Sequence, residues 1–169
     1  MKMKNSMLAA ALAAVFLLGG CGAGSTDEST GDSAPVTEAK SDITAEQLFE
    51  GIDEEKLDGR LFTGDEKFDK NLAKLYNTDA ENIVSGGMLY NTEGIYADEI
   101  SAIKFRDGTD GEALMQARLD SRTATFRDYR PEELDKLSKA KIISAGGYDV
   151  LIISDNAEDL AEFIIHNAI

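Results

Sequence analysis

The sequence predicts an α+β domain in which helices pack on a mostly antiparallel, four-stranded sheet built from two hairpins. The first observation is that strand-like segments come in two neighbouring pairs, each joined by a short turn containing glycine, instead of alternating singly with helices. The second is that amphipathic helical segments stand before, between and after these pairs. The third is the apolar run Val150–Ile153, whose lack of polar alternation indicates a strand covered on both faces.

Two helices are expected at the start of the domain. Thr44 and Gln47 have the spacing of a capping box, and apolar residues follow at helical intervals, which predicts a short helix. Thr63 and Glu66 repeat this spacing before an apolar stripe over residues 68–76. Asn77 is well placed to end this second helix in the left-handed conformation.

The first hairpin is expected between residues 83 and 105, with the turn at Asn91–Gly94. A helix should follow from about residue 111 to Tyr129, and Pro131–Leu137 is suited to a short extra helix because proline fits a first helical turn. The core-facing side chains expected on the long helix are Leu114, Met115, Leu119 and Phe126.

The second hairpin is expected over residues 141–154, with its turn at Gly146-Gly147. The last element should be an amphipathic helix over residues 156–167. Asp155 and Glu158 have capping-box spacing at its start.

The first twenty residues have the profile of a signal peptide: two lysines precede the unbroken apolar stretch Met7–Leu18. A twelve-residue helix would rise only about 18 Å, well short of the ~30 Å hydrocarbon core. The stretch ends in Leu18-Gly19-Gly20-Cys21, which resembles the bacterial lipobox. We therefore expect residues 1–20 to be removed and Cys21 to carry a diacylglycerol, with palmitate among its acyl chains. The alternative is an ordinary secretory signal with a coincidental cysteine.

Residues 21–41 are expected to form a disordered linker after the lipidated cysteine, because they are rich in Gly, Ser, Thr, Asp and Glu. Residues 42–169 then form a single α+β domain. Two acyl chains anchor a protein stably where one is marginal. The sequence thus predicts a membrane-anchored protein whose domain stands on the extracytoplasmic face of the cell membrane.

Three segments of the domain resemble a known family: Tyr96–Lys104, Phe126–Leu134 and Gly147–Ser154, following the lipobox and low-complexity tether. The chain is similar to small lipoproteins of clostridia and related Gram-positive bacteria that carry one domain of unknown function. The resemblance covers roughly Phe49 to the C-terminus and departs at the Asn91–Gly94 turn and after Ile165. It implies an envelope location and a fold family, and it supplies no catalytic residues.

Composition excludes several classes of function. The net charge of −15 would repel nucleic acids and anionic membrane surfaces. One cysteine and one histidine cannot build the usual cysteine or histidine metal sites. We therefore expect no cofactor and no metal site. The acidic group Asp107, Asp110 and Glu112 has the wrong spacing for an EF-hand and suits the N-terminus of a helix.

No catalytic residue is assigned. Ser138-x-x-Lys141 and Ser154-Asp155-Asn156 match two of the three penicillin-binding-protein motifs in order. The K-T-G element is absent, and the spacing is too short for that much larger fold. We therefore expect a non-catalytic binding or interaction module at the cell envelope, with a possible protein partner. The alternatives are a surface-tethered hydrolase that uses paired carboxylates, and a receptor for a small ligand or a cation.

Overall fold

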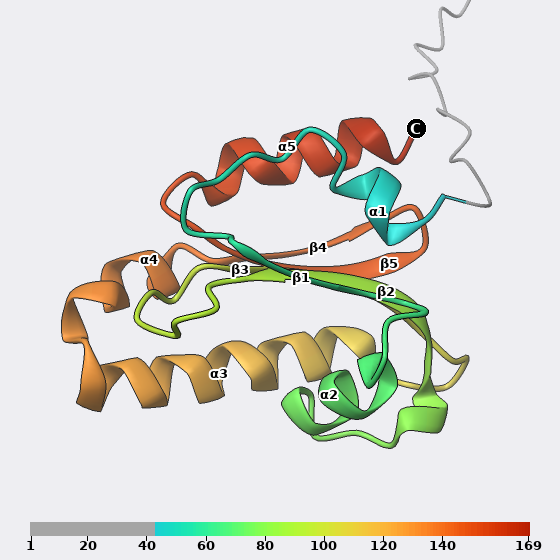
Figure 1. Cartoon of the computed structure of the whole chain (residues 1–169), viewed down its shortest axis with the longest axis horizontal. Helices are drawn as coiled ribbons and strands as arrows, with labels where there is room; N and C mark the ends of the chain where they lie inside the picture. The colour runs from blue at the N-terminus through green and yellow to red at the C-terminus, as the bar shows by residue number, and fades with distance from the viewer. Residues whose placement is uncertain (1–42) are drawn as a thin grey trace, which may run out of the picture. The chain divides into compact units, whose positions relative to one another are not determined.

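A five-stranded antiparallel sheet in the order β1-β2-β3-β5-β4 is the centre of the computed structural model, which describes residues 43–169 (Figure 1). The strands are β1 (Gly59–Phe62), β2 (Ile83–Tyr90), β3 (Glu99–Phe105), β4 (Lys141–Ala145) and β5 (Tyr148–Ile153). The α+β class and the antiparallel pairing are confirmed.

Helices cover both faces of the sheet. The helices are α1 (Ala45–Leu48), α2 (Phe68–Leu75), α3 (Gly111–Tyr129), α4 (Leu134–Ser138) and α5 (Ala157–Asn167), with short 3₁₀ turns η1 (Ala80–Asn82) and η2 (Pro131–Glu133). Helices α1 and α5 lie on one side of the sheet, and α2 and α3 lie on the other (Figure 1). We call these sides the α1–α5 face and the α2–α3 face.

The expectation of four strands is wrong, because β1 adds a fifth strand at the edge of the sheet. β1 has only four residues, Gly-Arg-Leu-Phe, and pairs with β2 from Gly59 opposite Tyr90 to Phe62 opposite Gly87. So short a segment has little β pattern of its own. It is a strand because β2 offers it a row of backbone partners.

Two of the three predicted capping boxes are wrong. Thr44 and Gln47 do form one at the start of α1. The Thr63 hydroxyl instead accepts a hydrogen bond from Gly86 N (2.7 Å) and contacts Gly86 O (3.1 Å), and α2 begins later, at Phe68. The N-cap of α5 is Asn156, which forms no side-chain cap bond, and Asp155 before it pairs with Lys56 at 2.8 Å. In both cases a tertiary partner outcompetes the local bond.

Two predictions about the backbone are confirmed, the left-handed conformation of Asn77 and the turn at Gly146-Gly147. Asn77, just after α2, has φ 49°, and Gly146 and Gly147 between β4 and β5 have φ 59° and 81°. Positive φ at both central residues is the geometry of a tight two-residue hairpin and is readily adopted by glycine.

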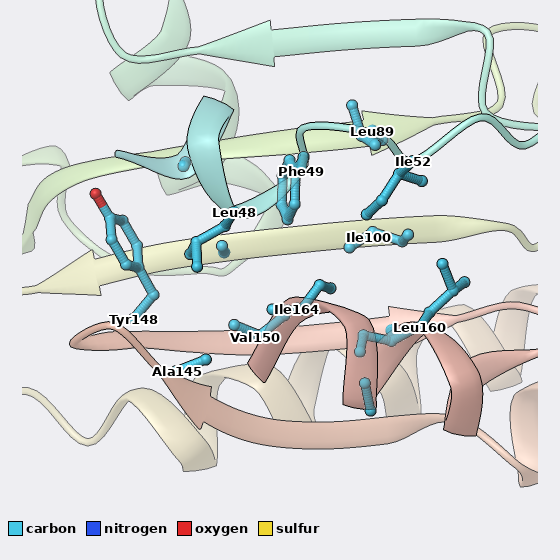
Figure 2. Packing of buried hydrophobic residues seen from close by; sticks show 14 of the residues in the cluster. Leu48, Phe49, Ile52, Leu89, Ile100, Ala145, Tyr148, Val150, Leu160 and Ile164 are labelled. Carbon is cyan, nitrogen blue, oxygen red and sulfur yellow. The ribbon is translucent and has the colours of Figure 1, made fainter. Parts of the chain in front are cut away.

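The core of the α1–α5 face joins the two ends of the domain. Apolar side chains from α1, β2, β3, β5 and α5 gather there (Figure 2); among those labelled are Leu48, Phe49, Leu89, Ile100, Val150, Leu160 and Ile164. Hydrogen bonds reinforce this packing, since Tyr148 Oη donates to Ile43 O (3.1 Å) and Asn167 Nδ2 donates to Leu48 O (3.0 Å) and Glu50 O (3.2 Å).

The central strands are buried on both faces. Val150 and Ile152 of β5 belong to the core of the α1–α5 face, whereas Leu151 and Ile153 belong to the core of the α2–α3 face, and all four are fully buried. The expectation of a doubly covered strand at Val150–Ile153 is therefore confirmed.

The signal peptide over residues 1–20, the lipidated Cys21 and the linker over residues 21–41 all lie outside the described residues. They remain predictions. Within residues 43–169, no helix combines the length and the apolar character that a bilayer span requires.

Candidate functional site

The α2–α3 face contains a buried carboxylate, Glu99, at the first position of β3. Only 1% of Glu99 is exposed to solvent. Along β3, Ile100 and Ala102 join the core of the α1–α5 face. Glu99 and Ser101 alternate with them and therefore point to the opposite face, beneath α3. A carboxylate in such a place needs charged partners, because burying an unpaired charge is costly.

The partners of Glu99 are two arginines one turn apart on α3. Arg118 grips the carboxylate with two bonds, from Nε to Oε1 (3.0 Å) and from Nη2 to Oε2 (2.6 Å). Arg122 Nε lies 3.5 Å from Oε2 but forms no hydrogen bond, although this nitrogen is buried. Arg122 Nη2 donates to Tyr96 O at 3.3 Å. Glu99 therefore satisfies one guanidinium, and the second keeps a buried donor without an acceptor.

The two arginines differ in their pKa. Burial lowers the pKa of Arg118, but its hydrogen bonds to Glu99 and the charge of Glu99 outweigh this effect and leave the pKa raised. Burial also lowers the pKa of Arg122, and there the charge of Glu99 does not compensate, so the pKa stays below its ordinary value. Both groups are cations at neutral pH, and Glu99 compensates the charge of Arg118 more fully than that of Arg122.

A pocket of about 340 Å³ adjoins these three residues. It lies between α2, α3 and strands β1 to β3, on the α2–α3 face of the sheet. Its lining residues are Leu61, Asn71, Lys74, Leu75, Met88, Tyr90, Asn91, Glu99, Arg118 and Arg122. Leucine and methionine side chains supply apolar walls, and the arginines and Lys74 supply positive charge.

The charge of this pocket is opposite to the charge of the whole protein. Three cations and a single carboxylate line it, whereas the chain carries a net charge of −15. Lys74 forms no ion pair with any carboxylate of residues 43–169. A local surplus of positive charge with low-dielectric walls attracts anions.

Asp98, the residue just before Glu99, belongs to a second group of buried charges. This group consists of Asp98, Glu133 and Lys136, and we call it the Lys136 cluster. Lys136 Nζ of α4 lies 2.5 Å from Asp98 and 2.9 Å from Glu133, and 3.7 Å from Asp155, which also pairs with Lys56. Glu133 accepts a further bond from Ala97 N at 2.9 Å. Burial raises the pKa of Glu133, but the bonds from Ala97 and Lys136 outweigh burial and hold the pKa below its usual range. Among the described residues, every buried side-chain N and O atom of this cluster has a hydrogen-bond partner.

Beneath α3, Tyr76 and Ser101 complete the polar part of the face. Tyr76 is 1% exposed and its hydroxyl forms a short hydrogen bond with Ser101 Oγ. Burial, with a smaller contribution from the charge of Glu99, raises the pKa of the Tyr76 hydroxyl well above its usual range. The Tyr76 phenol therefore stays neutral and links α2 to β3 beside the arginines.

Lys141, Asp155 and Asn156 of the penicillin-binding-protein motifs line one pocket, but Ser138 and Ser154 do not line it. Ser138 Oγ donates to Asp135 O at 2.7 Å at the end of α4, while Lys141 pairs with Glu158. Ser154 Oγ donates to Asn156 Oδ1 at 2.5 Å, within its own turn. Each side chain thus has a local partner that accounts for it.

The acidic group before α3 has a structural role. Asp110 is the N-cap of α3 and accepts a bond from Ala113 N at 3.0 Å, as expected for an acid at a helix N-terminus. Among the residues that the structure describes, no group of three or more His, Cys, Asp or Glu could hold a metal ion.

Glu99, Arg118 and Arg122 were not predicted as site residues from the sequence. A signal was present, because Glu99 opens the otherwise apolar strand segment Glu-Ile-Ser-Ala-Ile. Arg118 and Arg122 also lie at helical spacing between Met115 and Phe126, on the face of α3 that turns toward the core. Charges on a core-facing stripe are rare unless they are paired, and three together indicate a buried network.

Comparison with known proteins gives one match. Residues 62–154 match the family model described as Domain of unknown function (DUF4358). No curated protein and no solved structure matches the chain significantly. The matched segment runs from the end of β1 to just after β5, so it contains every residue that lines the pocket except Leu61. The expected relation to a family with one domain of unknown function is confirmed.

Proposed function

The chain belongs to the DUF4358 family, and we propose that it is a lipid-anchored, non-catalytic binding module on the extracytoplasmic face of the cell membrane. We further propose that its binding site is the pocket beside Glu99, Arg118 and Arg122. The signal-peptide profile and the lipobox ending in Cys21 support the proposed lipid anchor and membrane location. The pocket supports binding of a small ligand in preference to a flat protein interface.

One observation carries the binding proposal: Arg122 has a buried Nε with no hydrogen-bond partner among residues 43–169, next to a pocket. Buried donors in folded proteins are nearly always satisfied, and an exception calls for an explanation. The adjacent pocket gives one, since 18% of the Arg122 side chain is exposed and lines the pocket, where a bound molecule can supply acceptors that the protein does not.

The chemistry of the neighbouring acids supports binding without catalysis. A carboxylic acid that works as a general acid at neutral pH needs a raised pKa. Glu133 has a lowered pKa, and Glu99 is held by two bonds from Arg118. The described pocket is lined by one carboxylate, Glu99, whereas the hydrolase alternative needs a pair of carboxylates in one site, so the pocket suits binding better.

The anchor is tested at Cys21. Cys21→Ala should abolish incorporation of a fatty-acid probe and remove the protein from the lipidated membrane pool, because the thiol is the expected site of the diacylglycerol. Metabolic labelling followed by membrane fractionation measures both effects. Fatty-acid labelling that persists in Cys21→Ala would contradict the proposed lipid anchor at Cys21.

The binding site is tested by methionine-methyl NMR on the full chain in lipid nanodiscs. Met88 and Met115 are the only methionines between residues 43 and 169. Met88 lines the pocket, whereas Met115 is fully buried and does not line it. With a library of small fragments of every charge type, we expect binders to shift the Met88 methyl signal while leaving the Met115 signal nearly unchanged.

A variant that fills the pocket is the matched control. Leu75→Trp adds bulk to a pocket wall at the end of α2 and should abolish the fragment-induced shifts. Circular dichroism checks that this variant is folded. A wild-type protein whose Met88 signal responds to no fragment would refute the assignment of this pocket as the binding site.

A further inference from the structure

Resting on the proposed function, we infer that the ligand of this pocket is a small organic anion with a carboxylate head and an apolar body. The head binds at Arg122 and Lys74, and the body lies against Leu61, Leu75 and Met88. The carboxylate of the ligand then adds a second negative charge to a pocket in which Glu99 faces three cations.

The head group follows from the hydrogen bonds of the two arginines. Arg118 has Nε and Nη2 engaged by Glu99, so those donors are not free for a ligand. Arg122 has only one hydrogen bond, from Nη2 to a backbone carbonyl. A guanidinium presents its donors in a planar fork that matches the two oxygens of a carboxylate. Arg122 is therefore the residue in this pocket best suited to take a second carboxylate.

Lys74 makes the site selective for charge. It stands on the last turn of α2, across the pocket from the α3 arginines, and pairs with no carboxylate of the described residues. With Arg122 it gives the pocket two cations that Glu99 does not compensate by hydrogen bonds. Organic cations are repelled there, and neutral acceptors gain less from these charges than anions do.

The apolar body follows from the walls. Leu61 of β1, Leu75 of α2 and Met88 of β2 lie on three different elements and line the same pocket. The volume of about 340 Å³ is at the small end of the range for ligand pockets, about 300–1,000 Å³. Inorganic anions would leave these walls without contacts, so an organic anion is favoured.

Three probes of one shape test the head group: 4-phenylbutanoate, 4-phenylbutanol and 4-phenylbutylammonium. Each is titrated calorimetrically into the full chain in nanodiscs of zwitterionic lipid, with empty nanodiscs as the blank. We expect the carboxylate to bind at least about tenfold more tightly than the alcohol, as a charge-assisted hydrogen bond implies. The ammonium should bind more weakly than the alcohol.

Arg122→Gln removes the charge and the fork while keeping a side chain of moderate size. We expect it to weaken 4-phenylbutanoate binding about tenfold or more and to change the affinity for the alcohol less than about twofold. Lys139→Gln is the matched control, because Lys139 is an exposed cation outside this pocket that pairs with Asp135. It should bind all three probes like the wild type.

The outcomes separate the two proposals. If fragments shift Met88 but the carboxylate and the alcohol bind equally well, the pocket remains the binding site and the anionic head is refuted. An Arg122→Gln variant that is folded and binds the carboxylate as tightly as the wild type refutes the role of Arg122. If no fragment and no probe reaches Met88, both proposals fail together.

Discussion

The two groups of buried charge in the domain have opposite imbalances. In the Lys136 cluster, one ammonium serves two buried carboxylates, Asp98 and Glu133, at 2.5 and 2.9 Å. In the pocket, one buried carboxylate faces two guanidiniums, at 2.6 Å for Arg118 and 3.5 Å for Arg122. The chain places the two acids side by side, because Asp98 and Glu99 are consecutive.

The two groups of buried charge differ in whether the protein supplies all the hydrogen-bond partners. The acids of the Lys136 cluster have additional protein donors, such as Ala97 N for Glu133. The surplus guanidinium of the pocket has no protein acceptor for its Nε. A buried ion group that closes on itself ties elements together, whereas one that stays open beside a pocket is prepared for a ligand.

The largest effect should come from opening the closed cluster. Lys136→Met leaves Asp98 and Glu133 buried without their cation and should lower the free energy of unfolding by about 3–5 kcal/mol. Urea denaturation measures this change. Lys139→Met removes an exposed lysine that pairs with Asp135 and should cost less than about 1 kcal/mol. If both variants lose the same stability, the cluster is not the structural tie that we describe.

A smaller loss is expected at the open group. Glu99→Gln removes the negative charge that faces both arginines and weakens the two bonds from Arg118, but water from the adjoining pocket can solvate the guanidiniums. We therefore expect a loss of about 1.5–3 kcal/mol, the range of hydrogen bonds to charged groups. The same urea experiment gives the value. A loss exceeding that of Lys136→Met would mean that the pocket does not relieve the two guanidiniums.

The two arginines should then separate in stability. Arg118→Gln breaks a bidentate pair and should cost about 1.5–3 kcal/mol. Arg122→Gln removes an uncompensated charge that also lies 4.8 Å from the Phe126 ring centroid, and it should cost less than about 1 kcal/mol. Thermal unfolding of the unliganded proteins compares them. Equal losses of stability in the two variants would show that Arg122, like Arg118, has a structural role.

The smallest expected effect is on how the stability of the domain changes at acidic pH. The pKa of Glu133 is lowered in the folded state from its ordinary value of 4.5, so the ionised Glu133 stabilises the fold. This contribution is fully present above pH values near 4.5 and is lost as the pH falls through the lower, folded-state pKa. Glu133→Gln should therefore show a shallower fall in stability below that pH than the wild type. Identical slopes would contradict this.

Regular elements with strong patterns could be predicted from the sequence. The run Val150–Ile153 gave β5, and the glycine pair before it gave the turn, because continuous apolar character and positive φ are local properties. β1 could not be predicted in this way, since its four residues depend on β2 for pairing. The caps proposed at Thr63 and Asp155 failed for a similar reason: Gly86 and Lys56, both distant in the chain, take their side chains.

The candidate site was predictable only in part. Charges on a core-facing stripe of α3 could have indicated a buried network around Arg118 and Arg122. Their partner was not evident, because Glu99 is one of 32 acidic residues. Which acid meets which base depends on how β3 lies beneath α3. The pocket itself depends on where α2 lies beside α3, and no local pattern encodes that distance.

The bonds from Asn167 to Leu48 and Glu50, across 119 and 117 residues of chain, join the first and last helices of the domain, so this face is complete only when both ends are in place. A chain emerges from the ribosome N-terminus first, so the segment that contains α1 appears long before α5. Until the last dozen residues arrive, Leu48 and Phe49 lack the helix that covers them. The earliest segment of the domain thus docks among the last, and a nascent chain stalled before α5 presents an uncovered apolar face to chaperones.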